Sequence, residues 1–270
     1  MSVSPTTQPS VLPLSGLIGA ELPGIDLAAP LTDDVVAHIK TALTDHGVVV
    51  FRGQHIGPSE HVALARALGE IKYPPDYFPE TLREQGFPEV GVISTDNQLA
   101  YMTDMWHADV TWMPNPPRYS ILHMQQLPPA GGDTMWASQY AAYDWLSDPM
   151  KQFLEPLTVR HELPGFPDRG TVHPAVIRNP ISGRKALFVN KVFSTRILEL
   201  SQEESDALLA FLAVHTVKPE FICRVRWAPG DVGIWDNHYV QHYAVADYRP
   251  HARKIHRIEI VGEPTISAGA

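Results

Sequence analysis

Residues 232–242, VGIWDNHYVQH, have the pattern of two short strands joined by a turn. An apolar run leads into Asp-Asn, a pair that favours turns, and a second run with aromatic and β-branched residues follows. Many short strands with turn signals between them are typical of mostly β proteins. The pattern therefore predicts a β-sandwich or jelly roll, a cupin-like double-stranded β-helix with helices packed outside it. Further β-like runs occur at 119–124, 134–136, 157–161, 186–189, 223–227 and 255–261.

Helices are expected at four places around these strands. Thr32 can cap a helix that ends at His46. Ser59 can cap a second helix, which begins with the residue that follows it. A third helix is expected over roughly 138–147. The fourth opens at Ser201 with a capping box.

The chain shows no repeat, linker or charge run that would divide it. We expect a flexible N-terminus over residues 1–13, which are rich in Ser, Thr and Pro, and a single domain over 14–270. Residues 72–105 carry few regular signals. Because loops of this length inside a compact domain are usually functional, we interpret 72–105 as an active-site loop.

Composition excludes several classes of function. The 270 residues carry a formal net charge of -9 and no basic stripe, so we expect no nucleic-acid partner. No run of about 18 apolar residues exists, so we expect no membrane span. The N-terminus lacks a signal-peptide pattern. Cys223 is the only cysteine, which excludes an intramolecular disulfide and fits a reducing compartment. These features together predict a cytoplasmic protein.

A possible metal site lies in Trp106–Val110, WHADV. In a strand, residues i and i+2 point the same way, so His107 and Asp109 can offer an imidazole and a carboxylate to one ion. His242, in the opening motif, supplies a second imidazole if early and late strands pair. Two histidines and one carboxylate leave three positions of an octahedron open, which suits Fe(II) oxygenases. A closed zinc site would want four ligands, usually with thiolates.

The sequence resembles the taurine dioxygenase-like (TauD/TfdA) family of Fe(II)/2-oxoglutarate-dependent oxygenases, from about residue 14 to residue 262. The resemblance rests on six dispersed motifs in the family's order. They are GVVVFRGQ (47–54), WHADVTW (106–112), GGDTMWAS (131–138), GRKALFVN (183–190), WDNHYVQHYAVADY (235–248) and HRIEIVG (256–262).

The resemblance implies a role for seven residues. His107, Asp109 and His242 would hold the iron, and Thr134 with Arg253 would bind the distal carboxylate of 2-oxoglutarate. A guanidinium and a hydroxyl suit that carboxylate, because they give one charge-assisted and one neutral hydrogen bond.

Two more residues would meet the substrate. Arg257 would bind its anionic group, and the backbone N–H of Val110 would help. On one strand, Arg253 and Arg257 face the same side, and two buried guanidiniums together would need two anions. The resemblance therefore implies a small anionic substrate.

The chain departs from the taurine enzyme in its pocket. Pro74 and Thr103 stand where that enzyme has a His and an Asn, while Tyr77 and Phe193 are kept. These changes argue against taurine itself. Together with Trp106, Trp112 could line a more apolar cavity. The lid segment between His161 and His173 is short, and His238 replaces the usual Arg; we expect it in a supporting or surface position.

The implied reaction hydroxylates the substrate with O2 while 2-oxoglutarate becomes succinate and CO2. The leading hypothesis is a small organic anion of the sulfonate, alkyl sulfate or aryloxyalkanoate type. An alternative is an amino acid or other carboxylic acid in a biosynthetic pathway. A third hypothesis is a non-catalytic jelly-roll protein that binds metal or ligand. Relatives suggest a dimer or tetramer as an expectation for assembly.

Overall fold

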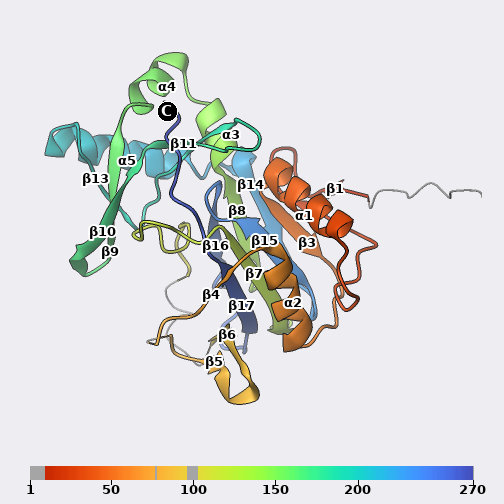
Figure 1. Ribbon diagram of the computed structural model, residues 1–270. Helices are drawn as coiled ribbons and strands as arrows, with labels where there is room; N and C mark the ends of the chain where they lie inside the picture. The colour runs from red at the N-terminus through yellow and green to blue at the C-terminus, as the bar shows by residue number, and fades with distance from the viewer. Residues whose placement is uncertain (1–9, 77, 96–102, 270) are drawn as a thin grey trace, which may run out of the picture.

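The computed structural model describes residues 10–76, 78–95 and 103–269, and two facing β-sheets form its centre (Figure 1). The larger sheet has the order β1 (Leu12–Pro13), β2 (Ala20–Glu21), β3 (Val48–Phe51), β15 (Val232–Asp236), β7 (Tyr119–Gln126), β17 (Lys254–Ile260), β6 (Phe87–Ser94) and β5 (Thr81–Leu82). Within the described residues, neighbouring strands of this order pair antiparallel, except that β2 and β3 are parallel. A further strand, β4 (Ile71–Lys72), pairs with β17 outside this order.

The smaller sheet has the order β14 (Ile222–Val225), β8 (Thr134–Ser138), β16 (Val240–Ala244). Both sheets contribute to one apolar core, so their inner faces pack on each other. This arrangement, with helices outside, is the predicted jelly roll. The shared core consists of Ile18, Val48, Val50, Leu122, Met124, Trp136, Cys223, Val225, Trp227, Trp235, Val240 and Ile255.

Two helices, α1 (Asp33–His46) and α2 (Pro58–Leu68), pack on the larger sheet and share a second core with it. α1 begins as predicted, since the side chain of Thr32 accepts from the N–H of Val35. The prediction of Ser59 as the cap of α2 is wrong. The cap is Gly57, whose N–H is bonded by Glu60, and Pro58 occupies the first helical position because it lacks the N–H that would be unpaired there.

A third group of elements packs at the other end of the sandwich (Figure 1). The predicted third helix ends early, as α3 (Gln139–Asp144), and α4 (Asp148–Leu154) follows it. The predicted fourth helix is α5 (Gln202–His215), and its capping box at Ser201 is present. The remaining strands are β9 (Thr158–Leu163), β10 (Phe166–Pro174), β11 (Val176–Arg178), β12 (Lys185–Leu187) and β13 (Ser194–Ile197), with short 3-10 turns at Arg83–Gln85 and Pro219–Phe221.

Residues 72–105 contain more regular structure than predicted. β6 pairs with β17 along Ser94–Gly91 and buries Val90 and Val92 completely. Pro88 and Gly91, which usually weaken a strand, obscured this element in the sequence. Gly91 is needed because a Cβ there would lie 2.8 Å from the ring of Phe78. Residue 77 and residues 96–102 lie outside the described residues, and the role of 72–105 as an active-site loop stays a prediction.

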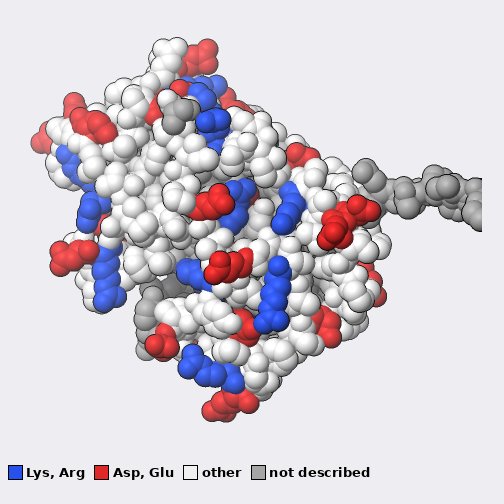
Figure 2. Space-filling model, in the orientation of Figure 1, with Lys and Arg blue, Asp and Glu red and all other residues white. Residues whose placement is uncertain are grey.

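The surface carries mixed charge. Figure 2 shows Lys and Arg side chains interspersed with Asp and Glu, with no continuous basic stripe among the described residues of this face. No helix within the described ranges is long and apolar enough to cross a membrane.

Candidate metal centre

Two histidines from distant parts of the chain pair through their backbones. The N–H of His107 donates to the carbonyl of His242 at 3.1 Å, and the N–H of His242 donates back at 2.7 Å. This bridge places the two imidazole centroids 4.1 Å apart. The pairing of an early and a late extended segment, predicted from the two motifs, is confirmed.

Asp109 completes the cluster. Its Oδ1 lies 3.8 Å from Nε2 of His107 and 3.7 Å from Nε2 of His242. All three side chains are buried, and their ligand atoms lie within 4.8 Å of one another. The other carboxylate oxygen, Oδ2, accepts a hydrogen bond from the hydroxyl of Ser120 at 2.8 Å. Oδ1 therefore faces the imidazoles while Oδ2 is held by β7.

The charges in this cluster suit a cation. Burial alone would raise the pKa of the Asp109 carboxyl, but His242, Arg257, His107 and the Ser120 hydroxyl together hold that pKa well below its usual range. Burial, reinforced by His107, lowers the pKa of His242 to about 3. At neutral pH the site therefore presents a carboxylate and a neutral imidazole, the forms in which these side chains bind metal.

The two N–O separations fit one Fe(II) ion. Two atoms that bind one ion at about 2.1 Å each can be at most about 4.2 Å apart, and both separations are shorter than that. Nδ1 of His107 lies 2.7 Å from the carbonyl of Met105. Donation to that carbonyl leaves the lone pair on Nε2, which faces Asp109. His107, Asp109 and His242 would hold the ion, with the remaining positions open for co-substrate and O2.

A second pair of side chains lies deeper between the sheets. Thr134 and Arg253 are 2% and 6% exposed, and Nη2 of Arg253 lies 3.5 Å from Oγ1 of Thr134. Nε of Arg253 donates to the carbonyl of Gly132 at 3.0 Å. Gly132 has a φ of 73°, and a Cβ on it would lie 3.2 Å from Cδ of Arg253. The structure thus brings together the two residues predicted to bind 2-oxoglutarate.

Sequence reasoning missed a partner of this pair. The indole N–H of Trp227 donates to Oγ1 of Thr134 at 2.9 Å. Because Trp227 and Arg253 both approach Oγ1 as donors, the hydroxyl hydrogen of Thr134 is left for a third group. A carboxylate is the acceptor that suits it.

Arg257 lies in β17 and contacts the metal cluster, whereas Arg253 comes directly before this strand. Its Nη1 is 3.4 Å from Oδ1 of Asp109, and its Nη2 is 3.0 Å from Oε1 of Glu259. These two carboxylates raise the pKa of the Arg257 guanidinium against the opposing effect of burial. Its guanidinium carbon lies 5.7 Å from the ring centroid of Phe78. Glu259, which the sequence reasoning missed, therefore fixes one edge of the guanidinium.

The other predicted pocket residues are placed less decisively. Val110 is half-buried and has a φ of 54°. Phe193 is half-buried in a turn where its N–H donates to Oδ1 of Asn190 at 2.9 Å. Trp112 is half-buried just after Val110, and the carbonyl of Thr103 accepts from the N–H of Ala244. Tyr77 lies outside the described residues. Contact of these side chains with a substrate stays a prediction.

The structure also shows the surroundings of Pro74, His238 and the short segment between His161 and His173. Pro74 lines a small cavity with Phe78, Gly91, Arg257 and the charged side chains of Lys72, Glu89 and Glu259. His238 is not on the surface, because it is 4% exposed and packs near Phe188 with Nε2 3.2 Å from the carbonyl of Pro116. The short lid segment forms the hairpin of β9 and β10.

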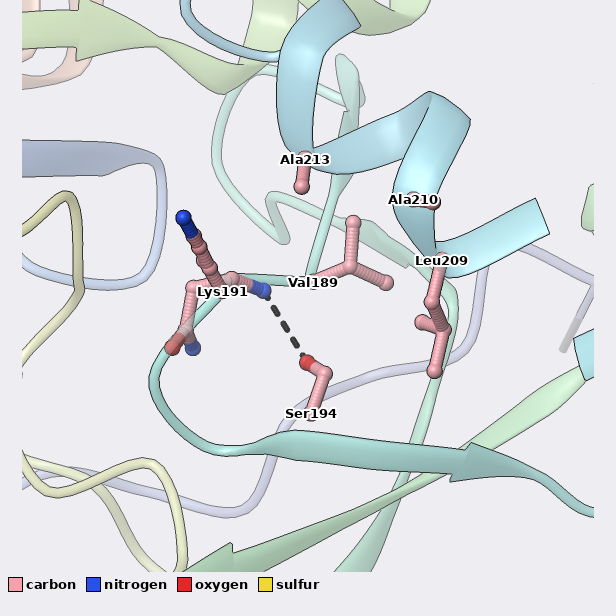
Figure 3. Close-up of a pocket in the computed structure, with 7 residues that line it drawn as sticks. Val189, Lys191, Ser194, Leu209, Ala210 and Ala213 are labelled. Atoms are coloured by element: carbon pink, nitrogen blue, oxygen red, sulfur yellow. Dashed lines mark hydrogen bonds between the residues drawn. The ribbon is translucent and has the colours of Figure 1, made fainter. Parts of the chain in front are cut away.

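A separate pocket of about 200 Å³ lies between α5 and residues 189–194. Figure 3 shows the side chains that line it. Its wall is mainly apolar, from Val189, Leu209, Ala210 and Ala213, and the N–H of Asn190 donates to the hydroxyl of Ser194 at its edge. It contains none of the metal or clamp residues.

Comparison with known proteins agrees with this site. The family model described as "Taurine catabolism dioxygenase TauD, TfdA family" matches residues 10–258. The chain is 35% identical to an alkylsulfatase of Acinetobacter baylyi, covering 98% of this chain and 89% of that protein. It is 34% identical to an alpha-ketoglutarate-dependent sulfate ester dioxygenase of Pseudomonas putida, covering 94% and 89%.

Solved structures give the same result. A taurine dioxygenase from Burkholderia xenovorans superposes with a TM-score of 0.88 at 36% identity, covering 97% of this chain and 92% of that one. The protein is an oxidoreductase that uses Fe(II), 2-oxoglutarate and O2, as the sequence predicted. The chain belongs to the TauD/TfdA family of 2-oxoglutarate-dependent dioxygenases.

Proposed function

We propose that the protein hydroxylates a small organic anion of the alkyl sulfate type, at the carbon that carries the sulfate. The single observation that carries this proposal is the position of Arg257. Its side chain is 15% exposed, and its guanidinium lies 3.4 Å from the carboxylate that would bind iron. An anionic group bound there would place its neighbouring carbon beside the metal. The similarity to the alkylsulfatase of Acinetobacter baylyi and the sulfate ester dioxygenase of Pseudomonas putida supports the choice of sulfate among organic anions.

Arg253 and Arg257 would each bind one of the two anions. Arg253 and Thr134 would bind the distal carboxylate of 2-oxoglutarate. The opposite, keto-acid end of 2-oxoglutarate would then reach the metal. Arg257 would take the substrate. Each guanidinium then meets one anion in a site that excludes water, where such a charge-assisted pair is strong.

The bound iron, with O2 and 2-oxoglutarate, supplies the oxidation. The overall change converts a substrate C–H to C–OH with one oxygen atom of O2. The other oxygen atom enters succinate, which forms from 2-oxoglutarate together with CO2. If the hydroxylated carbon carries a sulfate, the C–O bond to sulfate then breaks as the hydroxyl loses its proton. The products are an aldehyde and inorganic sulfate.

The side chains around the metal would orient the reactants and exclude water. Trp235 packs with its ring centroid 4.7 Å from that of His242, which covers one side of the ligand. Beside Arg257, Pro74 and Phe78 line a small cavity whose wall also includes the charged side chains of Lys72, Glu89 and Glu259.

A panel of compounds tests this proposal. The Fe(II)-loaded protein is incubated with 2-oxoglutarate, O2 and, separately, butyl to dodecyl sulfates, sulfonates including taurine, aryloxyalkanoates and amino acids. Succinate and free sulfate are quantified. We expect alkyl sulfates to stimulate succinate formation most, with one sulfate released per succinate. Strongest stimulation by an amino acid or another carboxylic acid would support the biosynthetic alternative instead. No stimulation by any compound would favour a binding protein.

We also infer a cytoplasmic location, because Fe(II) and 2-oxoglutarate are supplied there and Cys223 is a buried free thiol. A dimer or tetramer stays an expectation. Light scattering coupled to size-exclusion chromatography measures the mass directly, and a mass of 30.0 kDa, that of one chain, would rule both out.

A further inference from the structure

The side chain of Asn237 holds both backbone polar groups of Asp109. Its Oδ1 accepts from the N–H of Asp109 at 2.6 Å, and its Nδ2 donates to the carbonyl of Asp109 at 2.9 Å. The same Nδ2 donates to the carbonyl of Pro117 at 3.1 Å. Asn237 is fully buried, so water does not compete for these three bonds. We call this set of bonds the Asn237 clasp.

The clasp continues the pairing that begins at the histidines. His107 and His242 exchange two backbone hydrogen bonds, and regular antiparallel pairing would next set Asp109 opposite Val240. Instead, the amide of Asn237 takes the N–H and the carbonyl of Asp109. The segment from His107 to Asp109 is thereby held at both of its ends. Two ligands on one face of an extended segment require that restraint.

Val110, the residue after Asp109, has a strained backbone that the Asn237 clasp helps to hold in place. Val110 has a φ of 54°, the only positive φ of a non-glycine residue within the described ranges. A β-branched residue in this left-handed region is strained and persists there only when its surroundings fix it. The carbonyl of Val110 accepts from the N–H of Met113 at 3.0 Å, which anchors the far side of the turn. The clasp anchors the near side.

We propose that Asn237 is a positioning residue of the metal centre. By fixing the peptide groups of Asp109 and holding Val110 in its left-handed conformation, it directs the Asp109 carboxylate toward the ligand atoms of His107 and His242. Asn237 does not itself contact the ion, since its amide is fully engaged by Asp109 and Pro117. This role does not depend on the identity of the substrate.

Metal affinity of the full chain, measured without substrate or 2-oxoglutarate, tests the proposal. Mn(II) is titrated calorimetrically into metal-free wild type, Asn237→Ala and Asn179→Ala. Asn179 is the matched control, because it is also fully buried and its amide also makes three hydrogen bonds, to Tyr140, Ile181 and Ser182. We expect Asn237→Ala to weaken Mn(II) binding roughly 10- to 100-fold, the usual effect of losing a group that orients a ligand, and Asn179→Ala to leave it unchanged.

The double variant Asn237→Ala/Val110→Gly separates positioning from general damage, and it also covers the case in which Asn237→Ala folds poorly. Glycine adopts the left-handed conformation without strain, so the turn then needs the clasp less. We expect the double variant to regain part of the lost Mn(II) affinity. The proposal is overturned if Asn237→Ala binds Mn(II) like wild type, if Asn179→Ala loses as much affinity, or if the double variant binds as weakly as Asn237→Ala.

Discussion

Nη1 of Arg257 lies 3.4 Å from Oδ1 of Asp109, so the cation assigned to the substrate contacts a ligand assigned to the metal. On its other side the same guanidinium is held by Glu259 at 3.0 Å. A substrate anion that binds Arg257 is therefore fixed relative to the iron and not merely attracted into the cavity. This contact links the substrate proposal to the metal site.

Replacing Arg257 by Ala should raise the substrate KM much more than the KM for 2-oxoglutarate. Truncating one partner of a buried charged pair costs about 2–5 kcal/mol, or roughly 30- to several thousand-fold in affinity. The measurement is succinate formation at varied concentrations of each compound. Arg253→Ala is the matched variant, for which the larger effect should fall on 2-oxoglutarate. Equal increases of both KM values in Arg257→Ala would contradict the division of roles.

Replacing Trp227 by Phe should weaken 2-oxoglutarate binding and leave the substrate KM unchanged. The indole N–H bonded to Thr134 is lost, and the hydroxyl hydrogen is no longer fixed toward the carboxylate. One neutral hydrogen bond contributes about 0.5–1.5 kcal/mol, so the KM for 2-oxoglutarate should rise about 2- to 13-fold. In the Thr134→Val background the same replacement should have little further effect. Additive effects of the two substitutions would refute the coupling.

Acid should destabilise the fold partly through His61. This side chain belongs to α2 and is fully buried, and neither of its ring nitrogens has a hydrogen-bond partner within the described residues. Burial, with His123 and His256 nearby, lowers its pKa to about 3. The unfolded chain takes up the proton near the ordinary pKa of 6.5. The contribution to stability is therefore complete above that pH and is lost as the pH falls toward 3, by up to about 1.4 kcal/mol per pH unit.

Urea unfolding at a series of pH values measures this loss. Between about pH 3 and pH 6.5, the unfolding free energy of His61→Leu should change less with pH than that of wild type. His251→Gln, at an exposed position, is the control. An unchanged dependence on pH in His61→Leu would show that other groups cause the acid sensitivity.

Removing the metal ligand should abolish stabilisation by metal. An ion that binds only the folded state raises the unfolding temperature by mass action. Mn(II) should therefore raise the Tm of wild type in a concentration-dependent way and leave that of Asp109→Ala unchanged. Each protein is first treated with a chelator, which is then removed. Mn(II) is added, and unfolding is followed by circular dichroism. A Tm that rises equally in both proteins would place the ion elsewhere.

Much of the site was predictable because it rests on local patterns. His107 and Asp109 stand two apart on an extended segment, and the Asp-Asn turn before His242 marks where a second strand begins. The helices capped at Thr32 and Ser201 also follow from local chemistry. The side chains of Thr32 and Ser201, from which the helix starts were predicted, themselves accept the capping hydrogen bonds.

Two of the residues that the sequence did not reveal act through long-range packing. Asn237 and Trp227 meet partners that are more than 90 residues away in the chain, so no local pattern reports their roles. Glu259 stands two residues after Arg257 on β17, and the i, i+2 spacing of a strand is the signal that could have revealed it. β6 was missed for the same reason as Asn237 and Trp227. Its pairing with β17 and its burial outweigh the low strand propensity of Pro88 and Gly91.

The most direct test of the metal site is the visible absorption of the protein under anaerobic conditions. Fe(II) and 2-oxoglutarate are added to wild type, His242→Ala and Arg253→Ala, and the metal-to-ligand charge-transfer band is recorded against 2-oxoglutarate concentration. The structure predicts a band in wild type, none in His242→Ala, and one that needs far more 2-oxoglutarate in Arg253→Ala. The absence of a band in wild type, or an unaltered band in His242→Ala, would contradict the assignment of His107, Asp109 and His242 as the iron site.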